Sequence, residues 1–236
     1  MSTRARGLVA ECRERPWGDA VLHIPLSVLH VPLSRSAADP PALDDCVAYI
    51  ESEARQAVEF RPGSLGISVL ADRAEGVALF GSVWASSEAM SASEETEAPL
   101  RAELAKRAGR PVTVDDYQIP ISVIFDHAIL LLGGQAVRLT RIQVKPSQVD
   151  DVIEVVGDEV VPSLSEAAGF RAVLLFADPA SGRMISETIW RDPRARAAAP
   201  SVAAIIRREF PDEAGSDIPG FPDEDRKSTR LNSSHI

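Results

Sequence analysis

The chain has 236 residues, of which 45% are hydrophobic and 25% are charged, and its formal net charge is −10. That length allows one large domain or two small ones with a proper hydrophobic core. The negative charge argues against a nucleic-acid surface, which needs a clustered basic patch, and against docking on an anionic membrane.

The sequence carries neither a targeting signal nor a metal-binding motif. Its N-terminal residues are charged and lack the apolar stretch of a signal peptide, and the longest apolar run, residues 128–132, is too short to span a bilayer. Cys12 and Cys46 have neither a CxxC partner nor a cluster of histidines and cysteines at zinc spacing. We therefore expect a cytoplasmic protein with two reduced thiols and no metal site.

The most informative feature is an internal repeat with an offset of 106 residues. Residues 31–104 (copy one) align without a gap with residues 137–210 (copy two). The matching pairs include Trp84 with Trp190, Gly63 with Gly169, Asp72 with Asp178, and Gly76 with Gly182. So many matches at one offset predict a tandem duplication, and the period then restricts the folds to be considered.

Copy one predicts a strand, a helix, a hairpin and a second helix in chain order. The strand lies near LHVPLSR (29–35), and the apolar residues of the first helix recur at helical spacing until Gly63. Residues 65–71 and 77–84 flank DRAEG, whose Asp and Gly suit a tight turn. The second helix is expected to start at residues 86–88.

Copy two predicts the same elements. Its first strand alternates from Val137 onward, and Ser147 is expected to be the N-cap of the helix that follows. A hairpin of residues 170–177 and 183–190 comes next, and another helix is expected to start after Trp190, at Asp192.

The two copies differ at their C-terminal ends. Copy one adds a fourth strand, residues 111–125, whereas residues 211–225 of copy two are rich in Pro, Gly and acidic residues. The last strand of copy two is therefore expected to be missing or replaced. Residues 227–236 shift abruptly to Ser, Thr and Asn and resemble a vector read-through, so they are expected to be non-native. We divide the chain into an N-terminal extension (1–19), repeat 1 (20–126), repeat 2 (127–226) and this tail (227–236).

A strand, a helix ending in Gly-Phe, an apolar hairpin closing in Trp and a helix rich in Ala, Glu and Arg follow one another, most clearly in residues 169–199. This order resembles the antibiotic biosynthesis monooxygenase superfamily. The resemblance implies a dimeric α/β barrel, in which helices cover each of two four-stranded sheets. The expected fold class is therefore α+β, with two ferredoxin-like βαββαβ repeats that form this barrel within one chain. Members of the superfamily include cofactor-independent oxygenases of polycyclic aromatics and haem-degrading enzymes.

The last hairpin strand of each copy offers a candidate ligand pocket. Because side chains alternate along a strand, one face combines hydroxyl, apolar and indole groups, a mixture that suits a pocket. The other face is aliphatic and is interpreted as the better partner for a helix. The pocket candidates are Phe80, Ser82 and Trp84 in copy one, and Met184, Ser186, Thr188 and Trp190 in copy two. The alternative is that both tryptophans are packing residues at a strand–helix junction.

Three charged residues are further pocket candidates. Arg35 and Arg141 recur at the same offset on the first strands, where an arginine suits an anionic or quinone-like ligand, or equally a salt bridge at the rim. Glu187 is the one carboxylate in an otherwise apolar strand, and it is a candidate base if it faces the pocket.

The chain departs from the active branches that it resembles. The related oxygenases carry an asparagine four residues before the strand-end Trp, where this chain has Phe80 and Ser186. The haem-degrading enzymes carry a histidine about ten residues after it, where this chain has Glu94 and Pro200. These departures remove the obvious groups for oxyanion stabilisation and iron ligation. No catalytic residue is assigned, and no cofactor, haem included, is expected.

Two hypotheses about function follow. The chain is either a cofactor-independent monooxygenase-like barrel that acts on a small apolar aromatic substrate, or a non-catalytic barrel with a ligand-binding or structural role. In both cases the expected partner is a small apolar ligand rather than a nucleic acid or a membrane. The protein is expected to be a monomer with pseudo-two-fold repeats or a weak homodimer.

Overall fold

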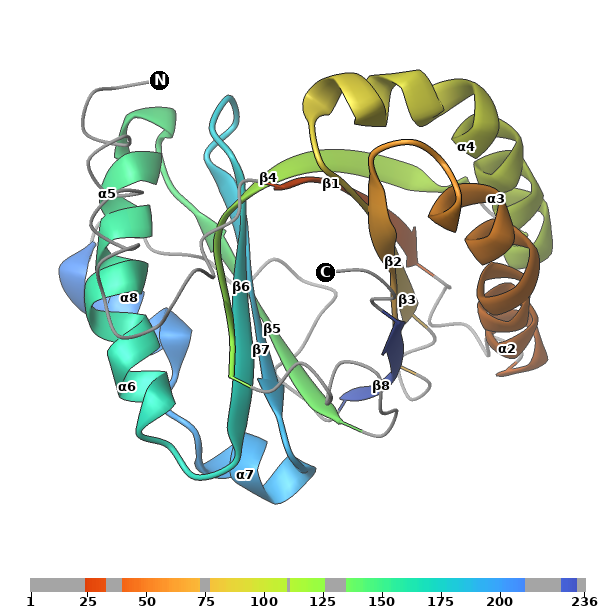
Figure 1. Ribbon diagram of the computed structural model, residues 1–236. Helices are drawn as coiled ribbons and strands as arrows, with labels where there is room; N and C mark the ends of the chain where they lie inside the picture. Colours follow the sequence, from red (N-terminus) through yellow and green to blue (C-terminus); the bar gives the residue numbers. More distant parts are fainter. Residues whose placement is uncertain are drawn as a thin grey trace. The chain divides into compact units, whose positions relative to one another are not determined.

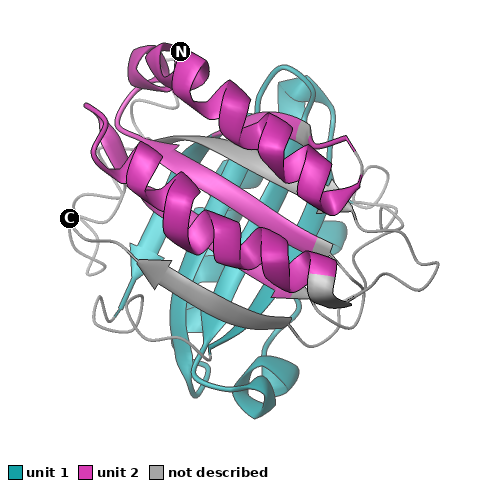
Figure 2. Cartoon of the chain, turned by 90° about the vertical axis from the view of Figure 1, so that its right-hand side faces the viewer, with its two compact units in different colours: residues 1–23, 118–127, 135–225 teal, residues 24–117, 128–134, 226–236 magenta. Residues whose placement is uncertain are grey.

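The computed structural model describes residues 24–32, 40–72, 77–109, 111–125, 135–210 and 226–232. The chain forms two compact units (Figure 2). Unit 1 comprises residues 1–23, 118–127 and 135–225, and unit 2 comprises residues 24–117, 128–134 and 226–236. One boundary between the units therefore falls inside a strand, between residues 117 and 118.

The elements follow the βαββα order that the sequence predicts for each copy. The first half contains β1 (Ile24–Pro32), α2 (Pro40–Tyr49), the π-helical turn η1 (Ile50–Ala54), α3 (Arg55–Glu59), β2 (Ser64–Asp72), β3 (Val77–Trp84), α4 (Ser87–Ala108) and β4 (Thr113–Ile124). The second half contains β5 (Ala136–Gln143), the 3-10 turn η3 (Pro146–Gln148), α5 (Val149–Val155), the π-helical turn η4 (Val156–Val160), α6 (Val161–Ser165), β6 (Phe170–Asp178), β7 (Arg183–Trp190), α7 (Pro193–Ala198), α8 (Val202–Glu209) and β8 (Arg226–Asn232). Within the described ranges, no helix is long and apolar enough to cross a membrane.

The sheet of unit 2 has the strand order β1–β3–β2–β8, and all its neighbours are antiparallel. Helices α2, α3 and α4 lie against one face of β2 and β3 (Figure 1). The core between them contains Cys46 and Ile50 from the first helical segment, Leu104 from α4, and Val69 and Trp84 from the strands. Removal of this apolar surface from water is the main stabilising contribution to the unit.

The sheet of unit 1 has the order β5–β7–β6–β4 and is also antiparallel. Its helices α5, α6 and α8 lie against one face (Figure 1). Val152, Leu164 and Ile206 from these helices pack against Val173 and Met184 from the strands. Each unit is therefore a two-layer structure of one sheet and one set of helices.

Strand β4 follows the helices of copy one but completes the sheet of unit 1. Its residues 118–124 pair with residues 172–177 of β6. Strand β8 follows the segment 211–225 and pairs with β2. That the native last strand of copy two is missing or replaced stays a prediction. The non-native origin of residues 227–236 stays a prediction.

Local details recur at the offset of 106 residues. The π-helical turns η1 and η4 start at Ile50 and Val156, and Gly63 and Gly169 both have positive φ angles, of 81° and 85°. Each glycine carbonyl accepts a hydrogen bond of 2.8 Å from the residue after the strand-end Trp. A Cβ atom on either glycine would lie 2.5 or 2.7 Å from an alanine Cβ on the following helix. Both positions therefore require glycine for conformation and for close packing. The origin of the copies by duplication stays a prediction.

Two helices start at or next to the residues that the sequence predicts, whereas the N-cap predicted at Ser147 differs. Ser86 and Asp192 cap α4 and α7, because their side chains accept hydrogen bonds of 3.2 and 2.8 Å from the backbone N–H three residues on. Ser147 was predicted to be an N-cap, and this was wrong. Pro146 begins the helical turn one residue earlier, because its fixed φ suits a first helical position, so that Lys145 becomes the N-cap.

Gly182 and Gly109 both have a left-handed backbone conformation, but only Gly182 is closely packed. Alanine substitutions at the two positions therefore show how much close packing adds to the cost of that conformation. Their φ angles are 73° and 66°, but a Cβ on Gly182 would lie 2.0 Å from the carbonyl oxygen of Val144, whereas nothing lies within 4 Å of one on Gly109. We expect Gly182→Ala to lower the free energy of unfolding by about 2–4 kcal/mol and Gly109→Ala by about 1 kcal/mol. Urea unfolding of both variants measures the difference, and equal losses would contradict the contact with Val144.

Candidate functional site

A cavity of about 60 Å³ lies in unit 2 between the strands β2 and β3 and the helical segments η1, α3 and α4. Its walls are mainly aliphatic, with Phe80 on the strand side. The polar residues that line it are Ser82 from β3, and Glu97 and Arg101 from α4. Val114 also lines it and is 42% exposed, so it marks the side of the cavity nearest to solvent. An apolar hollow with a few convergent polar groups is the usual composition of a small-molecule site.

Glu97 is the acidic residue of this cavity. It is only 9% exposed, and its Oε1 atom has no hydrogen-bond partner within the described part of the chain. Arg101 donates from Nη1 to Glu97 Oε2 at 3.3 Å, and its Nη2 pairs with the exposed Glu94. Burial raises the pKa of the Glu97 carboxyl, while the Arg101 guanidinium and the hydroxyls of Ser82 and Ser93 favour the charged form and oppose that rise. This carboxyl group is therefore suited to exchanging a proton with a ligand.

Ser82 and Trp84 form the strand side of the same arrangement. Because side chains alternate along β3, both residues point to the helix-covered face. Trp84 is fully buried, and its Nε1 donates to Ser82 Oγ at 2.9 Å. The indole N–H is thereby satisfied, and Ser82 is held at the cavity wall next to Phe80. Of the predicted candidates of copy one, Phe80 and Ser82 thus line the cavity, and Trp84 holds Ser82 in place.

The candidates of copy two lie in a packed core. Met184 and Trp190 belong to the core cluster of unit 1, and Trp190 Nε1 donates to Thr188 Oγ1 at 3.0 Å. Ser186 is fully buried, and its hydroxyl has no hydrogen-bond partner within the described ranges. Copy two therefore keeps the indole–hydroxyl pair of copy one in a setting dominated by aliphatic packing.

The structure corrects the interpretation of the two strand faces. Phe80 and Trp84 pack with residues of α2 and α4, and Met184 and Trp190 pack with residues of α5 and α8. The mixed faces therefore meet the helices, and the interpretation that the aliphatic faces are the better helix partners is wrong. The helix that starts directly after each Trp returns over the face on which the indole lies. The connection to this helix therefore decides which face is covered, rather than how aliphatic that face is.

The two charged candidates of copy two lie elsewhere. Glu187 points to the face of β7 opposite the other candidates, between Leu139 of β5 and Leu174 of β6 in the strand register. It is 4% exposed, its Oε1 atom has no partner in the described residues, and burial raises the pKa of its carboxyl to about 7. Arg141 is half-buried on that same face, two residues beyond Leu139. Arg35 lies outside the described residues.

Glu97 and Arg101 were not among the residues predicted from the sequence. A signal was available, because Glu97 shares helical spacing with Met90, Leu100 and Leu104, so that it falls among apolar positions of α4.

The positions expected of a haem-degrading enzyme carry other groups. Glu94 is exposed on α4 and pairs with Arg101, and Pro200 lies in the break between α7 and α8. In the described part of the chain, no group of three or more His, Cys, Asp or Glu side chains is placed to hold a metal ion. The cavity residues Glu97 and Arg101 instead offer proton transfer by a carboxyl group next to a fixed positive charge.

Known proteins resemble this chain in sequence and in fold. No protein-family model matches the chain. The uncharacterized protein Rv2557 of Mycobacterium tuberculosis is 32% identical over 149 residues, and the match spans 63% of this chain and 65% of that relative. The uncharacterized protein Rv2558 of the same organism is 28% identical over 193 residues, which are 81% of this chain and 80% of that protein.

Solved structures resemble the chain over most of its length. An anthrone oxidase-like protein has a TM-score of 0.60 at 16% identity, over 87% of this chain and 90% of that chain. A monooxygenase-like protein from Listeria innocua has a TM-score of 0.50 at 8% identity, over 92% and 99% of the two chains. The chain has the antibiotic biosynthesis monooxygenase fold. The resemblance predicted from the sequence is thus confirmed for the fold, which is all that identities this low establish.

Glu187 predicts a pH-dependent stability. Its pKa is raised from 4.5 to about 7, so its stabilising contribution is present below pH 4.5 and is lost as the pH rises through 7. We expect this group to lower the free energy of unfolding by up to about 3 kcal/mol between pH 4.5 and pH 8. Glu187→Gln should remove that loss because the amide does not ionise.

Denaturant unfolding at pH 5 and pH 8 measures this effect. Glu166→Gln is the control, because Glu166 is exposed. If Glu187→Gln and the wild type lose the same stability between the two pH values, Glu187 does not ionise in an apolar setting.

Proposed function

We propose that the chain is a cofactor-independent monooxygenase-like protein that acts on a small apolar aromatic substrate at the copy-one cavity. The observation that carries this proposal is a buried carboxyl, Glu97, with an unpaired oxygen atom in an otherwise apolar cavity of the described part of the chain. The shared fold with an anthrone oxidase-like protein supports it. Substrates of the anthrone or quinol type suit the site, because removal of one proton leaves them electron-rich enough to react with dioxygen.

The proposed chemistry uses Glu97 as the proton acceptor. For an anthrone-type substrate, Glu97 takes a proton from the ring methylene, and the electron pair left on carbon forms a bond to dioxygen. Glu97 returns the proton to the peroxide, and loss of water leaves the ketone, so one oxygen atom enters the product and the other leaves as water. Arg101 lines the same cavity and stabilises the negative charge that develops on the substrate and the peroxide.

A second function is favoured by the size of the cavity. A volume of about 60 Å³ is smaller than the roughly 150 Å³ of an engineered cavity that binds benzene, so a substrate ring enters only if Phe80 or Val114 moves. Phe80 also occupies the position at which the resembling oxygenases carry an asparagine. The second candidate is therefore a non-catalytic protein that binds a small apolar ligand or has a structural role.

Oxygen uptake with anthrone- and quinol-type substrates distinguishes the two functions. We expect Glu97→Gln to lower turnover by about 10²–10⁴-fold, the usual contribution of a positioned general base. Glu94→Gln is the matched control, because Glu94 also pairs with Arg101 but lies one turn earlier on the exposed side of α4. Binding without turnover by the wild type would favour the second function.

We also propose that the two halves associate within one chain, as the two subunits do in the dimeric barrels of the superfamily. The pairing of β4 with β6 supports this, because the last strand of copy one completes a sheet whose other strands belong to copy two. Residues 1–126 expressed alone should therefore aggregate or unfold, since β4 would lose its pairing partner. A stable monomer with native-like thermal stability, measured by circular dichroism and light scattering, would show that the halves are independent.

A further inference from the structure

We infer that the copy-one cavity binds a neutral, apolar hydroxy compound of no more than one ring, whose O–H group donates a hydrogen bond to Oε1 of Glu97. The inference rests on the proposed function for the choice of this cavity as the site, and it narrows the proposed substrates to one-ring quinols. It makes Glu97 a residue that determines specificity as well as a proton acceptor.

The two oxygen atoms of the Glu97 carboxyl have different surroundings. Oε2 accepts a hydrogen bond of 3.3 Å from Nη1 of Arg101, whereas Oε1 is buried and has no hydrogen-bond partner in the described part of the chain. A buried acceptor without a donor is costly, and an ionised carboxylate has no hydrogen atom of its own to offer. Because Glu97 lines the cavity, a ligand that supplies a hydrogen atom to Oε1 removes this cost.

The surroundings of Glu97 favour a neutral donor over a cationic one. An ammonium group at Oε1 would leave water for a cavity with mainly aliphatic walls, and it would lie close to the Arg101 guanidinium that already pairs with the same carboxyl. Burial of a further charge is costly, and like charges repel one another. An anionic group would instead meet the lone pairs of Oε1. A hydroxyl group supplies the hydrogen atom without a charge.

The size of the cavity limits the ligand to a single ring. Its volume of about 60 Å³ is below the roughly 150 Å³ of an engineered cavity that binds benzene, so even one ring requires a lining side chain to move. Phe80 is 4% exposed, and β3 is paired at this position with Leu29 of β1 and with Val69 of β2, so the strand side is fixed. Val114 is 42% exposed and is the lining residue that can yield. One ring therefore enters past Val114, whereas a second ring would also have to displace Phe80.

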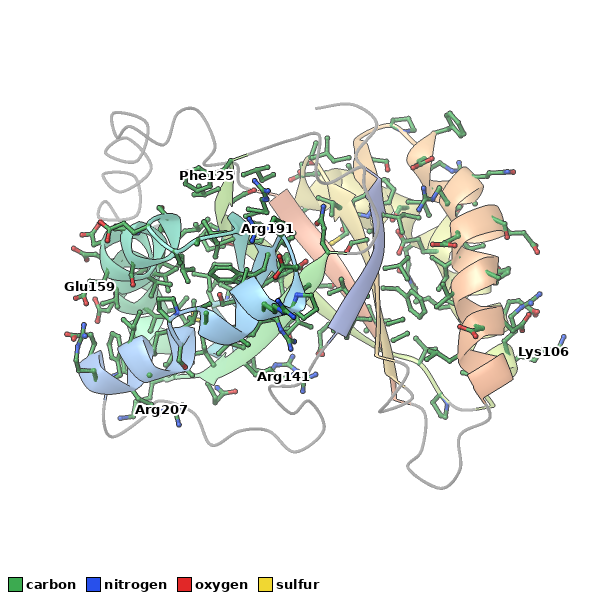
Figure 3. All side chains as sticks on the ribbon, turned by 90° about the horizontal axis from the view of Figure 1, so that it is seen from below. Lys106, Phe125, Arg141, Glu159, Arg191 and Arg207 are labelled. Carbon is green, nitrogen blue, oxygen red and sulfur yellow. The ribbon has the colours of Figure 1, made fainter. Side chains whose placement is uncertain are left out.

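Copy two has no carboxylate at the position that matches Glu97. The residue 106 positions further along the chain is Ala203. Arg207, at the position that matches Arg101, is exposed on α8 (Figure 3), and its Nε donates to the carbonyl of Ala203. A ligand that needs the Glu97 oxygen is therefore expected to bind once per chain rather than once per copy.

Phenol and toluene test the need for a hydroxyl group, because they differ only in a hydroxyl or a methyl group on one ring. Their affinities are measured by titration calorimetry for the full chain and for Glu97→Leu, which keeps much of the bulk and removes the acceptor. We expect the ratio of phenol affinity to toluene affinity to fall by about 10–100-fold in Glu97→Leu, the usual contribution of a hydrogen bond to a charged group. Glu94→Gln should leave this ratio unchanged, because Glu94 pairs with Arg101 from the exposed side of α4. Phenol should saturate the wild type at one molecule per chain.

Two further ligands test the size limit and the preference for a neutral donor. We expect 2-naphthol and protonated benzylamine each to bind the wild type at least about tenfold more weakly than phenol, because of the second ring and of the buried charge. If Glu97→Leu does not fold, as judged by circular dichroism, Glu97→Met repeats the comparison with an unbranched side chain.

Three outcomes overturn the inference. They are a folded wild type that does not bind phenol, an equal ratio of phenol to toluene affinity in the wild type and in the folded Glu97 variant, and binding of 2-naphthol or benzylamine as tight as that of phenol. Selective binding of phenol without oxygen uptake supports the inference and counts against the proposed function alone. Oxygen uptake that does not depend on a hydroxyl group of the substrate does the reverse.

Discussion

The hydrogen bond from a buried indole to a hydroxyl two residues earlier fixes the junction between the hairpin and the second helix in both halves. Trp84 and Trp190 are fully buried, and a buried indole N–H without an acceptor would cost about 1–3 kcal/mol. Ser82 and Thr188 supply that acceptor from the same strand face, at 2.9 and 3.0 Å. The two interpretations of these tryptophans, as packing residues and as parts of a site, are therefore compatible in copy one.

The fold could be predicted from the sequence because its signals are local. The strands of the two hairpins, the glycines that follow the first helices, and the helix starts near Ser86 and Asp192 each depend on a short backbone segment, and the described residues contain all of these elements. Ser147 shows the limit of such signals, because the proline before it begins the helical turn and removes the need for its side chain.

The site was harder to predict because it depends on contacts between elements. Alternation along β3 divides its residues correctly into two faces, but both faces are largely apolar, so composition does not decide which one the helices cover. Glu97 is one of several glutamates in α4, and its burial follows from how α4 lies on β3. Glu187 was recognised as unusual for the right reason, since it is a carboxylate among aliphatic residues, but it lies on the opposite face from the pocket candidates.

The division of β4 between the two units has a consequence for the order of folding. The hairpins β2–β3 and β6–β7 join residues close in sequence, whereas the pairing of β4 with β6 joins Gln118 to Ala177, which lies far along the chain. Contacts between distant residues form slowly, because the loop between them must close before any bond compensates for the lost entropy. During synthesis, β4 therefore leaves the ribosome before its partner exists, and the N-terminal half must wait for copy two with an unpaired strand.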